Sequence, residues 1–202
     1  MPSAVTPVRA RVAYGTRARL AERMVTEKAA RREILAQPRF LPDAQAPAAE
    51  RARVRGEARA HLEALRHRGA LCDSIDVLMT HAVRAELGER GWDHPWPPPP
   101  PTAPRSGRWP GSRDRSWPEV ISMRLPAELA ERLQAACAHV SMPAIVELRE
   151  WRDAHPEVIT AAGDPDLYAE YERLAARVIT PGDVLRAAID KELPAKKQSV
   201  DP

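Results

Sequence analysis

A short stretch near residue 120, EVISMRLP, places polar side chains at every second position. Ser122 and Arg124 are separated by apolar residues, as side chains are on the two faces of a β-strand. The apolar residues are Ile121, Met123 and Leu125. A hydroxyl both donates and accepts hydrogen bonds, and a guanidinium donates a parallel pair to a planar acceptor. The polar face is a candidate binding surface, and the apolar face needs a partner strand and a cover.

A second arginine-bearing stretch, VRARVAYGT, lies near the N-terminus. Its alternation places Arg9, Arg11 and Ala13 on one face. Val12 and Tyr14 fall on the opposite face, which predicts that both are buried. An arginine on an exposed strand also discourages edge-to-edge aggregation, and this alternative role stays open for all the strand arginines.

The starts of two expected helices carry further polar groups. Ser74 begins one helix, and Thr180 and Gly182 lie at the start of the other. Free N–H groups at a helix N-terminus attract phosphate, although Ser and Thr at such positions also cap helices. Asp76 and Asp183, in the same first turns, favour the helix dipole but repel phosphate locally. Phosphate binding and capping both stay open as roles.

The residues of common catalytic and metal sites do not occur at the required spacing. The sequence has no P-loop, nucleophile elbow or HExxH. His61 and His67 are six residues apart, which does not suit a metal shared along one helix face. Cys72 and Cys137 form no CxxC pair, which is typical of free thiols in a reducing compartment. We predict a protein that is not an enzyme and holds no metal or cofactor.

Composition indicates a soluble, cytoplasmic, bacterial protein. The 202 residues include 31 Lys and Arg and 28 Asp and Glu. The bias toward Arg, Ala and Pro indicates a high-GC genome. No apolar run approaches the roughly 20 residues of a membrane span, and the N-terminus lacks the apolar core of a signal peptide. We therefore expect no membrane partner.

A proline-rich linker, residues 89–118, divides the chain into two units. Proline donates no backbone hydrogen bond and disfavours helix before it, so we predict an extended spacer with polyproline II character. Residues 1–88 hold 16 basic and 10 acidic residues, whereas residues 119–202 hold 10 and 15. A polyanion would therefore meet the N-terminal unit first. The alternative is a proline motif that binds a partner through its tryptophans: Trp92, Trp96 and Trp109.

Apolar residues at helical spacing predict helices in both units. In the first unit these are a helix from about Thr16, one over 48–68, and one that ends before Gly88. In the second, Pro126 opens a helix, and Ser141 and Pro143 restart one that stops near Pro156. The last two helices begin at the caps Asp164 and Thr180.

The two units share an approximate internal repeat. RVAYGTRARLAERM (11–24) aligns with VISMRLPAELAERL (120–133), and DVLMTHAVRAEL (76–87) aligns with DVLRAAIDKEL (183–193). The strand near 8–14 is thus the natural antiparallel partner for the strand at 120–125. The fold class we predict is mainly α, with two units and inserted helices that share one two-stranded antiparallel ribbon.

The strand, proline and helix of ISMRLPAELAERL resemble the ribbon-helix-helix family of DNA-binding proteins. In that family a strand leads into helix A, then a tight turn and helix B, and here helix B resembles ITPGDVLRAAIDKEL. The repeat is similar to the tandem form, with two units in one chain. About forty residues separate helix A from helix B in each unit here, where the family has a few. YGT also replaces RLP in the first unit.

The resemblance implies sequence-specific binding of double-stranded DNA by the ribbon in the major groove. The implied base contacts are Ser122, Arg124, Arg11 and Arg9. The phosphate contacts would come from the helix starts: Thr180, Gly182 and Ser74. Such a protein would be a transcriptional repressor or a plasmid partition or transfer accessory factor, located at the nucleoid.

Two other functions stay open on the sequence alone. The inserted helices predict a helical protein-interaction module, antitoxin-like or driving self-association. In the second alternative, the internal repeat is accidental and the chain is simply a helical scaffold.

Overall fold

The computed structural model describes residues 4–104, 109–111, 117–156 and 164–193. Over these ranges the chain is mainly helical with one two-stranded antiparallel sheet, which confirms the mainly α part of the prediction. In chain order the elements are β1 (Val5–Val12), α1 (Thr16–Leu35), a 3-10 turn (Pro38–Phe40), α2 (Ala48–His67), α3 (Ile75–Glu89), β2 (Glu119–Pro126), α4 (Ala127–Ala154), α5 (Pro165–Ala175) and α6 (Pro181–Glu192). No helix in the described ranges has the length and apolar character needed to cross a bilayer.

The two strands pair with each other across the proline-rich segment, as predicted. They are antiparallel, with Arg9 opposite Ser122 and Arg11 opposite Val120. The inner face is almost fully buried at Ala10 and Val12 of β1 and at Ile121, Met123 and Leu125 of β2, and partly buried toward the start of β1, whereas the outer arginines are exposed. The prediction for Tyr14 was wrong, because this side chain is 88% exposed. The strand ends at Val12, and Gly15 turns the chain with a φ of 83°, so Tyr14 lies outside the alternation.

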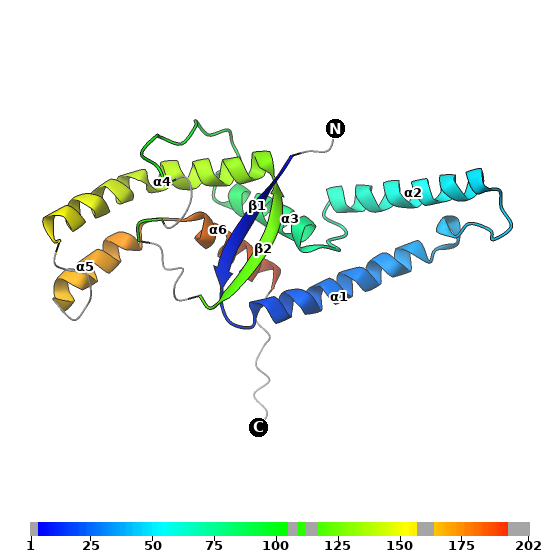
Figure 1. Ribbon diagram of the computed structural model, residues 1–202, viewed down its shortest axis with the longest axis horizontal. Coiled ribbons are helices and arrows are strands. Elements are labelled where there is room, and N and C mark those ends of the chain that lie inside the picture. Colours follow the sequence, from blue (N-terminus) through cyan, green and yellow to red (C-terminus); the bar gives the residue numbers. More distant parts are fainter. Residues whose placement is uncertain (1–3, 105–108, 112–116, 157–163, 194–202) are drawn as a thin grey trace, which may run out of the picture.

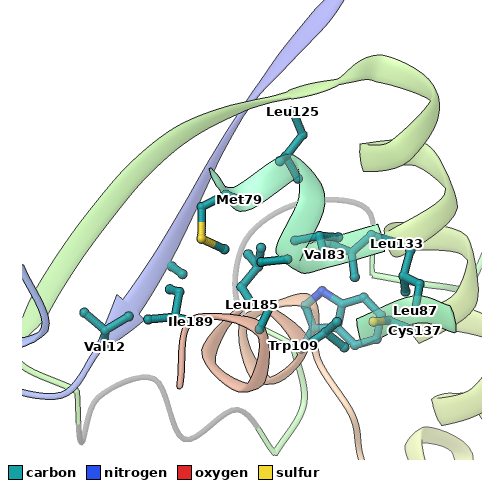
Figure 2. Packing of buried hydrophobic residues seen from close by; sticks show 14 of the residues in the cluster. Val12, Met79, Val83, Leu87, Trp109, Leu125, Leu133, Cys137, Leu185 and Ile189 are labelled. Atoms are coloured by element: carbon teal, nitrogen blue, oxygen red, sulfur yellow. The ribbon is translucent and has the colours of Figure 1, made fainter. Parts of the chain in front are cut away.

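Two helices, α3 and α6, cover the inner face of the ribbon. They pack against each other, α3 also against β2 and α6 against β1, so each helix covers the strand of the other half. Figure 2 shows their apolar side chains meeting beneath the ribbon. The fully buried residues there include Met79, Val83, Leu125, Leu185 and Ile189. The two halves of the sequence therefore share one hydrophobic core.

The remaining helices form two arms on opposite sides of the ribbon (Figure 1). We define the basic arm as residues 16–67, with α1 and α2, and the acidic arm as residues 127–175, with α4 and α5. Each arm contains the helix that follows a strand together with the insertion between that helix and the helix beneath the ribbon. The predicted helix over 48–68 is confirmed as α2.

The expected restart at Ser141 and Pro143 was wrong, because α4 runs unbroken through both. Proline removes one hydrogen bond from a helix interior, which costs stability but does not always end the helix. Here Ile145 and Leu148 are fully buried and hold the second half of α4 against the core. The Ser141 hydroxyl also donates to the carbonyl of Ile179 at 2.8 Å and accepts from its N–H at 2.9 Å.

The proline-rich segment is docked along α4 in its described part. The Gln134 side chain donates to the carbonyl of Pro104 at 2.7 Å. A ring nitrogen of His139 lies 3.0 Å from the carbonyl oxygen of Pro97. Trp109, a partner-contact residue only in the alternative reading of this segment, is buried in the core beside Leu87 and Cys137 (Figure 2). The described residues between α3 and β2 therefore pack against the rest of the fold and do more than separate its two halves.

Candidate nucleic-acid interface

The outer face of the ribbon brings together all four predicted base-contact residues. Arg9 and Arg11 of β1 and Ser122 and Arg124 of β2 are exposed on this face. Because side chains alternate and the inner ones are packed on α3 and α6, these four cannot turn inward. The outer face is thus a strip of guanidinium and hydroxyl groups beside the exposed Val120.

The carboxylate of β2 is directed away from this strip. Glu119 accepts hydrogen bonds from the backbone N–H groups of Gly15 and Arg17, each at 2.9 Å. These bonds, the one from Arg17 first, lower the pKa of Glu119. Glu119 therefore caps α1, whose own N-cap residue, Gly15, has no side chain. No local pattern in the sequence indicates this contact, because its partners lie about a hundred residues apart.

Arg124 makes a two-point contact with Asp76 in the first turn of α3. Its backbone N–H donates to Oδ1 at 2.8 Å, and its Nε donates to Oδ2 at 3.0 Å. The Arg124 side chain is still 69% exposed. The sequence pattern assigns Asp76 to the helix dipole and to local repulsion of phosphate, whereas the fold places it against a predicted base-contact residue.

The other half of the ribbon has no such contact. Counted from the start of the following helix, Ala13 occupies the position of Arg124, three residues before α1, whereas the repeat alignment pairs Arg124 with Gly15. Neither counterpart is an arginine. Asp183, the repeat counterpart of Asp76, accepts from Thr180 Oγ1 at 2.7 Å and from Arg186 at 2.5 Å. Burial alone would raise the pKa of Asp183, but these hydrogen bonds outweigh it and lower the pKa. The outer face is therefore asymmetric.

The predicted phosphate contacts lie at the starts of α3 and α6, where both caps are formed. Ser74 Oγ accepts from the N–H of Val77 at 3.3 Å. Thr180 is 4% exposed, and its hydroxyl also accepts from the N–H of Asp183 at 3.2 Å in a capping box. Gly182 is partly exposed in the same first turn. Capping occupies the two hydroxyls, and phosphate contact stays a prediction.

Arg186 supports the end of β1 from below. Its Nη1 donates to the carbonyl of Arg11 at 3.0 Å, and its guanidinium lies 5.2 Å from the centre of the Trp117 ring. Arg186 and Trp117 border a hollow of about 250 Å³ that is also lined by Thr16 and Asp190. Arg186 was missed in the sequence because it reads as a polar position on a helix.

The buried carboxylate of Asp73 fixes the start of α3 to the basic arm. Asp73 accepts from Arg66 Nε at 2.8 Å and from its Nη2 at 2.7 Å, and Arg31 lies 3.5 Å away. The hydrogen bonds from Arg66 lower the pKa of Asp73. Nearby, Glu27 accepts from the N–H of Cys72 at 3.0 Å. These contacts set the position from which Asp76 reaches the ribbon.

The remaining chemistry-bearing residues form no further site in the described ranges. No three His, Cys, Asp or Glu side chains there are placed to hold a metal ion. Cys72 and Cys137 are both buried and unpaired as disulfides, and burial raises the pKa of Cys137 to about 12. No family model, curated protein or solved structure matches the chain, so its resemblance to the ribbon-helix-helix family rests on the sequence pattern alone.

Proposed function

We propose that this protein binds double-stranded DNA sequence-specifically, with the outer face of the ribbon in the major groove. The observation that carries the proposal is the strip of Arg9, Arg11, Ser122 and Arg124 on one exposed face of a ribbon whose other face is buried. A two-stranded ribbon fits the major groove, where every base pair presents a distinct set of donors and acceptors. Proteins of this kind act as transcriptional repressors or as accessory factors in plasmid partition or transfer.

Each outer residue has a defined role in such a complex. A guanidinium can pair with O6 and N7 of guanine, and the Ser122 hydroxyl is a less selective contact. Val120, 41% exposed and opposite Arg11 in the ribbon, suits contact with a thymine methyl group. Because Arg124 has no counterpart at Ala13, the preferred site is an imperfect palindrome whose half-sites differ.

In vitro selection tests the proposal. The protein is incubated with a library of random duplexes, and the bound fraction is sequenced after several rounds. Enrichment of an asymmetric palindromic motif supports the proposal. The selected duplex is then titrated by fluorescence anisotropy over a salt series, since an affinity without its salt concentration cannot be interpreted. Failure to enrich any motif would contradict sequence-specific binding.

Replacing Arg124 with alanine should weaken binding to the selected duplex by about 1–3 kcal/mol, the value of one bidentate base contact. Binding to a scrambled duplex should change little, because phosphate contacts dominate there. Arg173→Ala is the matched control, since this arginine on α5 is 75% exposed and lies on the acidic arm. An equal loss on both duplexes would show that Arg124 is not a base contact.

The arms favour a second candidate function, association with another copy of the chain. The basic arm holds 12 basic and 7 acidic residues. On its helix α1, Val25 is 70% exposed and is followed at helical spacing by the exposed Lys28 and Arg32. Neither cation has an ion-pair partner among the described residues.

The acidic arm carries the complementary pattern, with 4 basic and 10 acidic residues. On α4, Val146 is 42% exposed and is followed at helical spacing by the exposed Glu150 and Asp153. These two carboxylates have no ion-pair partner within the described ranges either. In this second proposal, the basic arm of one copy lies along the acidic arm of another.

Charge reversal tests the association of arms. Analytical ultracentrifugation at low salt should show self-association of the wild type that weakens as salt is added. The variants Lys28→Glu/Arg32→Glu and Glu150→Arg/Asp153→Arg should each associate at least several-fold more weakly, since each exposed pair contributes about 0.2–1 kcal/mol. A mixture of the two variants should associate again. A monomeric wild type, or a mixture that stays monomeric, would contradict this function.

A further inference from the structure

Asp76 holds Arg124 through the backbone N–H and Nε, and it leaves the two terminal nitrogens of the guanidinium for a base. One carboxylate oxygen accepts from the Arg124 backbone N–H and the other accepts from Nε. The first bond fixes the end of β2 relative to α3, and the second fixes the direction of the guanidinium. The contact joins residues 48 positions apart, so it depends on the assembled core.

The terminal nitrogens of Arg124 are left for a ligand. An arginine donates from Nε, Nη1 and Nη2, and the end of the fork, with both Nη atoms, matches O6 and N7 of guanine. Only Nε is engaged with a described residue, and the side chain is 69% exposed. A long side chain that is already oriented loses less rotamer freedom when it binds.

We propose that Asp76 is a positioning residue that determines specificity, by orienting Arg124 for bidentate pairing with a guanine. The inference rests on the DNA-binding function proposed above. The negative charge of Asp76 also opposes a backbone phosphate at the same place, so the pair favours a base over the phosphate backbone. The other half of the ribbon lacks both the arginine and the aspartate that would orient it. Ala13 occupies the position of the arginine, and Asp183 is engaged in its capping box. Strict selection of guanine is therefore confined to one half-site.

Asp76→Asn tests the inference, with Asp166→Asn as its control. Both aspartates are the second residue of a helix, but Asp166 begins α5 on the acidic arm, away from the ribbon. Both substitutions remove one charge from a helix N-terminus, so an effect on the helix dipole is common to them. Each variant is titrated against the selected duplex, a duplex with the guanine of the Arg124 half-site replaced, and a scrambled duplex.

Asp76→Asn should reduce discrimination at that guanine by about tenfold, within the usual cost of one base mismatch. Binding to the scrambled duplex should stay equal or rise, because a charge that repels phosphate is gone. Asp166→Asn should leave discrimination at the wild-type value. In an Arg124→Ala background, Asp76→Asn should cause no further loss of discrimination.

The inference would be overturned if the Asp76→Asn variant discriminated at the guanine as well as the wild type does. It would also be overturned if Asp76→Asn reduced discrimination equally with Arg124 and with alanine at position 124. In both cases wild-type recognition of the motif would still stand. A wild type that enriches no motif would overturn the proposed function, and this inference with it. The two failures are thus distinguished by the wild-type selection alone.

Discussion

Replacing Leu125 with alanine is expected to lower the free energy of unfolding by about 2–5 kcal/mol, the range for large-to-small changes in a packed core. Leu125 is fully buried at the end of β2, where the ribbon meets α3 (Figure 2). Alanine leaves a cavity in a core that both halves of the chain share, and such a cavity costs free energy because the surrounding side chains collapse into it only in part. Urea denaturation followed by circular dichroism measures the change.

The same substitution should reduce binding to a selected DNA site. Arg124 directly precedes Leu125, so a shifted strand end displaces the guanidinium and its contact with Asp76. Val120→Ala is the control for the stability measurement alone, because Val120 is itself a proposed base contact. Val120 is 41% exposed on the outer face, and its replacement should change the free energy of unfolding by no more than about 0.5 kcal/mol. Similar destabilisation by the two variants would contradict the assignment of inner and outer faces.

The ribbon and its helices could be predicted because local rules determine them. Alternation alone separated Arg124 from Leu125 and assigned the correct face to each. The caps at Asp164 and Thr180 marked the starts of α5 and α6, because a short acceptor followed by proline satisfies a helix N-terminus locally. A short apolar strand needs a partner, and the repeat supplied one at 8–14.

The errors lie where tertiary packing overrides local preference. Pro143 suggests a helix boundary, but buried neighbours on α4 keep the helix intact. Trp109 lies in the segment predicted as an extended spacer, but its ring is buried in the core. Tyr14 follows the alternation in sequence, whereas Gly15 ends the strand geometry. In each case the deciding atoms belong to a distant segment or to a backbone angle that periodicity does not report.

The four outer residues of the candidate interface were predicted from the sequence, but the contacts that other residues make with the ribbon were not. Four outer residues were found by periodicity, whereas Asp76, Glu119 and Arg186 were not assigned to the ribbon. Charged residues on helices are usually solvated, so sequence gives no reason to pair Asp76 with a strand 48 residues away. Such contacts follow from the way α3 and α6 cross under the opposite strand.

Replacing Asp73 with alanine is expected to lower the free energy of unfolding by about 3 kcal/mol, as when one partner of a buried ion pair is removed. The Asp73 side chain is 3% exposed and accepts both bonds of the Arg66 fork, whose guanidinium would lose its partner. Glu63→Ala is the matched control, since Glu63 approaches the same arginine at 3.4 Å but is 75% exposed. Its removal should cost less than about 1 kcal/mol. Equal costs would contradict a special role for the buried carboxylate.

The pH dependence of the Asp73 effect has a definite sign. Arg66 lowers the pKa of Asp73 in the folded protein, so its stabilisation is complete above the ordinary aspartate pKa of about 3.9 and is lost as pH falls further. Urea midpoints of the wild type and Asp73→Asn should therefore differ most at neutral pH and converge below about pH 4. A difference that stays constant from pH 7 to pH 3 would mean that lost packing or hydrogen bonding, rather than the charge of Asp73, accounts for it. Because Asp73 lies three residues before Asp76, the loss at low pH should also release the start of α3 that holds Arg124.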